Sequence, residues 1–145
     1  MAQYEFELIK VGYVNKEIKT ILAIKDIIFE ADDEIVTIPT EHDGMKVECV
    51  GFKQGFIDEH VRYHDWHHSS QGDGERVPAE YVTEACNYIR IPENVKKIIF
   101  PSSIGAISFG AFNHAHDRVQ FVLEEGITHC KVNTQGKLTY NYKWL

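Results

Sequence analysis

The sequence predicts a fold between α/β and mainly β in class, in which short coils stack into a solenoid within one domain. Three observations support this prediction: a β-rich run stopped by proline occurs twice, a spacing in the twenties relates two apolar segments, and both ends of the chain alternate apolar and polar residues. The chain has 145 residues, of which 43% are hydrophobic. A chain of this size can bury a core without metals or crosslinks.

The first part of the chain is expected to form a β cap. Tyr4–Leu8 alternates apolar and charged residues, as a strand with one buried face does, and Ile9–Val14 continues the pattern. The apolar residues of Ile18–Phe29 fit a helical stripe, but their β-branched side chains favour a strand equally. The pattern leaves both structures open for that segment.

Two stretches in the middle of the chain share one order of features. Ile35–Phe56 begins with a β-rich run that Pro39 stops, continues through a turn at Asp43-Gly44, and then returns to apolar residues. Ile98–Phe112 repeats this order. The equivalent positions are Ile38-Pro39 and Phe100-Pro101, Val47 and Ile104, Val50 and Ile107, and Phe56 and Phe112.

A third copy starts at Phe121, which lies 23 positions after Ile98. Periods in the twenties indicate a solenoid, because each coil is too small to bury its own apolar residues and must stack on the next. A partial match at Ile89–Pro92 indicates either a truncated coil or strands from two faces. The equivalences of the third copy are Phe121 with Ile98, Leu123 with Phe100, Ile127 with Ile104, and Cys130 with Ile107.

The tail Gly136–Leu145 alternates aromatic and polar residues, which predicts a strand that caps the last coil. An exposed aromatic row there would alternatively form a homodimer contact or a carbohydrate-binding surface. The expected divisions of the single domain are an N-terminal cap (1–34), a first coil (35–57), a histidine-rich insertion (58–87), further coils (88–130) and a C-terminal cap (131–145).

The segment Ile91–Ile127 resembles the BspA-type leucine-rich repeat, whose pattern runs apolar-x-Ile-Pro, Val-x-x-Ile-Gly and Ala-Phe. Ala111-Phe112 is its clearest signature, and the likeness extends to Val36–Phe56. Gly55 replaces the usual alanine, and Ser108 the usual glycine. The resemblance implies a short right-handed leucine-rich-repeat solenoid with a β-sheet along one face. It also implies non-catalytic binding, often at bacterial surfaces, and supplies no catalytic residues.

The composition narrows the classes of partner. A formal net charge of −7 repels phosphates, so we expect no nucleic acid. No apolar run is long enough to span a bilayer, and the start of the chain lacks the pattern of a signal peptide, which predicts a cytoplasmic location. Cys49, Cys86 and Cys130 form no CxxC pair, so we expect buried thiols and no nucleophile.

The histidine-rich insertion is the sharpest candidate for a site. His60, His64 and His68 are four apart, so on a helix they would share a face and could ligate zinc or nickel. The segment lacks the glutamate of an HExxH motif, so Glu59 or Asp65 would have to act as the general base. A metal-binding protein or a metal-dependent hydrolase is therefore the alternative function.

The preferred interpretation of the insertion is a solvated loop without a cofactor, and the alternative to it is a recognition element. A protein partner is expected to dock either on the sheet face or on this loop. Arg62, Tyr63, Trp66 and His67 are of the types found at interfaces, and long loops are often recognition elements. His114 and His116, farther along the chain, are expected in a polar turn. The sequence thus predicts a protein-binding module that is not an enzyme.

Overall fold

The computed structural model describes residues 1–11, 19–54, 83–85, 88–127 and 130–140. Its two longest strands, β1 (Gln3–Val11) and β2 (Lys19–Ile28), form an antiparallel pair. The strand predicted for Tyr4–Leu8 is therefore confirmed, and the part of the ambiguous segment from Lys19 to Ile28 is a strand. That segment imitated a helical stripe because β2 is covered on both faces: Leu22 and Ile24 lie in the main core, while Ala23 lies in a small second cluster.

The main sheet is mixed. β2 pairs in parallel with β5 (Met45–Val50), and β5 pairs in parallel with β9 (Ala106–Ile107). β4 (Glu41–His42) joins β5 as an antiparallel hairpin, which gives the order β1-β2-β5-β4 with β9 beside β5. Asp43 and Gly44 have φ values of 51° and 79°, as a two-residue hairpin turn requires. The turn predicted there is confirmed.

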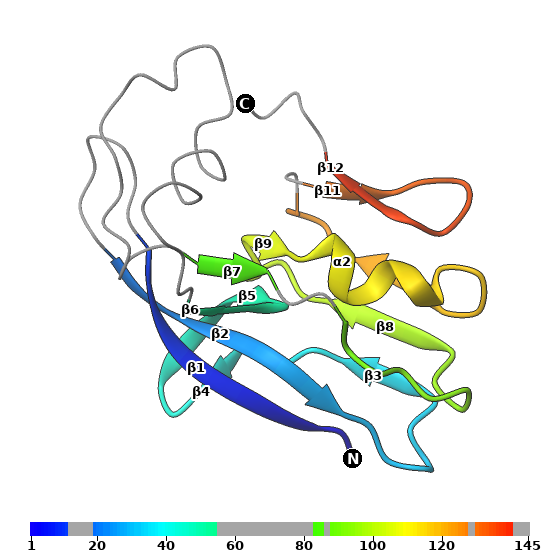
Figure 1. Ribbon diagram of the computed structural model, residues 1–145, viewed down its shortest axis with the longest axis horizontal. Coiled ribbons are helices and arrows are strands. Elements are labelled where there is room, and N and C mark those ends of the chain that lie inside the picture. The colour runs from blue at the N-terminus through cyan, green and yellow to red at the C-terminus, as the bar shows by residue number, and fades with distance from the viewer. Residues whose placement is uncertain (12–18, 55–82, 86–87, 128–129, 141–145) are drawn as a thin grey trace.

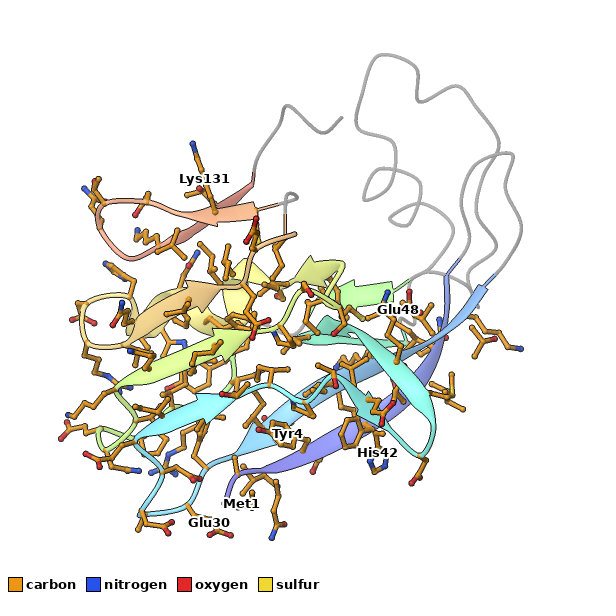
Figure 2. All side chains as sticks on the ribbon, turned by 180° about the vertical axis from the view of Figure 1, so that it is seen from behind. Met1, Tyr4, Glu30, His42, Glu48 and Lys131 are labelled. Atoms are coloured by element: carbon orange, nitrogen blue, oxygen red, sulfur yellow. The ribbon has the colours of Figure 1, made fainter. Side chains whose placement is uncertain are left out.

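The sheet curls enough to bring side chains of its outer strands β1 and β4 into contact. Phe6 of β1 stacks on His42 of β4 with 3.8 Å between ring centroids and 7° between ring planes. Three inter-strand steps separate these strands, so in a flat sheet they would lie about 14 Å apart. Tyr4 lies 6.1 Å from Phe6, and its hydroxyl donates to the Thr37 carbonyl at 3.3 Å. Figure 2 shows Tyr4 and His42 close together on this side.

A second, parallel sheet closes the core. It has the order β10-β8-β3 and consists of β3 (Ile35–Thr37), β8 (Lys97–Phe100) and β10 (Gln120–Leu123). Phe121 pairs with Ile98, and Ile98 pairs with Val36, so the three buried side chains form one row. The equivalence predicted between Phe121 and Ile98 is confirmed by this register, as is that between Val50 and Ile107 in the main sheet.

The prediction of a short right-handed leucine-rich-repeat solenoid is wrong. The described residues form a mostly β structure whose mixed sheets curl into a half-barrel (Figure 1). A solenoid sheet continues in parallel from coil to coil, whereas here the antiparallel pair β1–β2 is built into the main sheet, where β2 lies beside β5. The spacing of apolar residues does not predict that β2 lies beside β5, because these two strands are not copies of one repeat.

Short elements complete the described structure. One of them, α2 (Phe109–Phe112), contributes Phe112, whose ring packs edge-on against that of Phe100 with 5.4 Å between ring centroids. The strand predicted in the tail is confirmed where the structure describes it. Within the described residues, no helix is long and apolar enough to cross a membrane. The remaining elements are β6 (Phe52–Gln54) paired with β7 (Thr83–Ala85), α2 (Phe109–Phe112), the 3-10 turn η2 (Asn113–Ala115), and β11 (Cys130–Val132) paired with β12 (Leu138–Tyr140).

Candidate functional site

The C-terminal end of β2 extends past its partner. Pairing with β5 ends where Ile24 meets Val50, and Gly51 then turns the chain away with φ +85°. The Gly51 N–H donates to the Ile24 carbonyl at 2.7 Å and closes this ladder. The last residues of β2, Asp26–Ile28, keep β1 on one side, and no described strand pairs with them on the other.

An extended segment, residues 88–92, faces this end of β2. Its side chains alternate: Ile89 and Ile91 are buried, whereas Tyr88 and Arg90 are exposed. The Ile89 N–H donates to the Ala111 carbonyl at 3.0 Å, which ties the segment to α2. The alternation therefore places the aromatic and the guanidinium on the side away from the core.

Side-chain hydrogen bonds fix both walls. The Arg118 guanidinium donates to the carbonyl of Pro92 at 3.1 Å and to that of Ile91. The Asn94 amide donates to two carbonyls of the turn that follows β2, at 2.9 and 2.7 Å. Because these bonds join residues distant in the sequence, they hold the 88–92 segment at a fixed position relative to β2.

A groove of about 480 Å³ lies between these walls. Its volume is within the range of ordinary ligand sites. Ile28 is 48% exposed and Tyr88 is 61% exposed, so apolar surface on both walls is uncovered. The lining residues are Asp26, Ile27, Ile28, Phe29, Tyr88, Arg90 and Pro92.

The two charges of the groove lie on opposite walls. The Asp26 carboxylate accepts the N–H of Ile27 at 2.9 Å. Among the described residues, Arg90 forms no ion pair and Asp26 forms none with it. The groove therefore presents one acid and one base separated by apolar surface.

The aromatic wall is held in place by a histidine. The ring of Tyr88 stacks on His114 of η2, with 4.1 Å between centroids and 30° between planes. Partial burial, and secondarily the charge of Arg118, lower the pKa of His114 from its usual 6.5. The imidazole is therefore neutral at pH 7, and the stack is a contact between two uncharged rings.

The structure does not describe the site residues that were predicted from sequence. The candidate metal ligands and partner-binding residues all lie outside the described residues. Within the described part of the chain, no three His, Cys, Asp or Glu side chains are grouped to hold a metal ion. The residues outside are His60, His64 and His68, proposed as ligands, and Arg62, Tyr63, Trp66 and His67, proposed as partner contacts, together with Glu59 and Asp65.

Other predictions fall on described residues and are confirmed. His114 and His116 lie in and beside the turn η2, and a ring nitrogen of His116 is 2.7 Å from the Asn113 carbonyl oxygen. Cys49 and Cys130 are buried, and burial raises the pKa of the Cys130 thiol to about 11. Cys86 lies outside the described residues.

The groove itself was missed at the level of sequence. The sequence shows Ile89–Pro92 as a partial repeat, and the alternation of its isoleucines with Tyr88 and Arg90 is the signal that points to the two exposed side chains. Asp26 carries no comparable signal, because nothing local shows that β2 loses its neighbour after Ile24.

No protein-family model matches this chain, and no curated protein or solved structure matches it significantly. The chemistry of the groove is therefore the guide to function. Among the described residues that line it, there is one carboxylate and one guanidinium but no serine, threonine, cysteine or histidine.

Proposed function

We propose that this protein is a non-catalytic binding module that holds a protein partner in the groove between β2 and residues 88–92. The observation that supports this proposal is the combination of uncovered Tyr88 and Ile28 with a charge on each wall. Tyrosine and arginine are the types that contribute most binding energy at protein interfaces.

The rigidity of the walls favours binding as well. Arg118 and Asn94 hold the 88–92 segment, and His114 supports the ring of Tyr88. A wall that is already ordered loses little conformational entropy when a partner docks, so more of the contact energy appears as affinity. The mixed polarity of the groove, one acid and one base on apolar surface, matches a peptide segment with side chains of both signs.

The test starts from a random-sequence peptide library displayed on phage and selected on the wild-type protein. Selected peptides are then measured against Tyr88→Ala and Arg90→Glu. We expect each substitution to weaken binding at least about tenfold, which corresponds to about 1.4 kcal/mol.

Two matched controls lie outside the groove. Ile35→Ala removes an apolar side chain that is also 61% exposed, and Lys131→Glu makes the same charge reversal on β11, at the far hairpin in Figure 2. Both should bind like the wild type, and circular dichroism should show that all four variants are folded. A selection without binders, or peptides that bind the groove variants as tightly as the controls, would contradict the proposal.

A further inference from the structure

The groove runs along an open strand edge. β2 has ten residues, but only Leu22, Ala23 and Ile24 pair with β5. Beyond this point the Ile27 N–H donates to the carboxylate of Asp26 at 2.9 Å. The Asp26 side chain therefore accepts a backbone donor that a neighbouring strand could use instead.

The opposite wall has the geometry of a second strand without being paired as one. Residues 88–92 are extended, and Tyr88, Arg90 and Pro92 line the groove while the intervening isoleucines are buried. At about 3.3 Å per residue this wall is about 16 Å long, which fits an extended segment of about five residues.

We infer that the groove receives an extended peptide as an additional β-strand along Asp26–Ile28 of β2. This inference rests on the proposed function and specifies its binding mode. A peptide carbonyl takes the Ile27 N–H in place of the Asp26 carboxylate, so main-chain hydrogen bonds supply affinity and side-chain contacts supply specificity.

Charge complementarity specifies the peptide. Arg90 forms no ion pair among the described residues, and the Asp26 carboxylate is released when the strand adds. The ligand is therefore an extended segment with one acidic residue facing Arg90, one basic residue facing Asp26, and an apolar side chain against Tyr88 and Ile28.

The first experiment is an N-methyl scan of a peptide from the phage selection, bound to the full chain. A strand that pairs along one edge uses every second amide. We expect N-methylation of alternate amides to weaken binding at least tenfold and N-methylation of the intervening amides to change it less than twofold. Hydrogen exchange at the Ile27 amide should also slow when the peptide binds.

The second experiment uses Asp26→Ala. This variant should keep the alternating N-methyl pattern but lose its preference for the basic peptide residue over norleucine. Asp33→Ala is the matched control, since Asp33 also accepts a backbone N–H, that of Glu30 at 2.8 Å, but lies outside the groove lining. It should retain the preference.

The failure of this inference differs from the failure of the proposed function. If Tyr88→Ala abolishes binding while the N-methyl scan is flat or the Ile27 amide is unaffected, the groove binds peptides without strand addition and the inference is overturned. If Tyr88→Ala leaves binding intact, or no peptide is selected, both are overturned.

Discussion

A substitution at Gly51 tests the turn that ends the pairing of β2 with β5. A Cβ atom at this position would lie 2.7 Å from the Cβ of Ser108 and 3.2 Å from that of Ala111. Carbon atoms in van der Waals contact lie about 3.5–4.0 Å apart. Gly51→Ala must therefore displace either the turn or the chain around α2.

The expected loss of stability follows from three contributions. The left-handed backbone at φ +85° costs an alanine about 1–2 kcal/mol. Overpacking adds about 1–3 kcal/mol, and the reduced entropy of the unfolded chain returns about 0.4–1 kcal/mol. We expect Gly51→Ala to lower the free energy of unfolding by about 3 kcal/mol.

Gly44→Ala provides the matched control. Gly44 has a similar φ of +79°, but a Cβ there would meet no atom within 4 Å. Only the backbone contribution applies, so the expected loss is about 1 kcal/mol. The difference between the two variants, about 2 kcal/mol, isolates the packing of Gly51 against its neighbours.

Urea unfolding followed by far-ultraviolet circular dichroism measures both variants. The double variant Gly51→Ala with Ser108→Gly removes the atom at 2.7 Å and should recover part of the loss, as a double-mutant cycle would show. Equal destabilisation by Gly51→Ala and Gly44→Ala would refute the close packing of this turn.

Three other predictions concern the groove wall, pH and metal. Arg118→Met removes both hydrogen bonds to the 88–92 segment, so it should lower the free energy of unfolding in urea by about 1–2 kcal/mol. It should also weaken peptide binding, although Arg118 does not line the groove. Unchanged stability and binding would show that Arg118 does not anchor this segment. Because the pKa of His114 is lowered in the folded protein, the unfolded chain takes up the proton first as pH falls below 6.5, and stability should decrease there. His114→Phe should reduce this decrease between about pH 7 and about pH 5, and an identical slope would contradict the assignment. Untagged protein should contain no stoichiometric zinc or nickel and should keep its thermal midpoint in chelator. Metal that is lost together with a fall in midpoint would instead support the alternative of metal ligation by His60, His64 and His68.

Sequence patterns predicted local pairing better than the assembly of strands. The spacing of apolar residues predicted that Phe121 is equivalent to Ile98, and these residues are paired in the structure. Their equivalence is readable because side chains in one row face the same core. The pairing of β2 with β5 cannot be predicted in this way, because these strands are not copies of one repeat. Their pairing depends on how the whole sheet is assembled.

The candidate site was hidden from sequence for a related reason. Asp26, Arg90 and His114 come from three separate parts of the chain, and no motif links them. Composition instead drew attention to the histidine-rich insertion, because clustered histidines are visible without any knowledge of the fold. The groove lies between the end of β2 and residues 88–92, which are far apart in the sequence. It can therefore be recognised only from the three-dimensional structure.

The same departure from a repeated parallel sheet accounts for the groove. A strand that had a partner along its whole length would leave no open edge, but β5 turns away at Gly51 while β2 continues to Ile28. The Asp26 carboxylate then accepts a hydrogen bond from the Ile27 N–H, and residues 88–92 form the opposite wall. Gly51 is thus linked to binding as well as to stability. If Gly51→Ala shifts the end of the β2–β5 ladder, it should weaken peptide binding under conditions where the protein remains folded, whereas Gly44→Ala should leave binding unchanged.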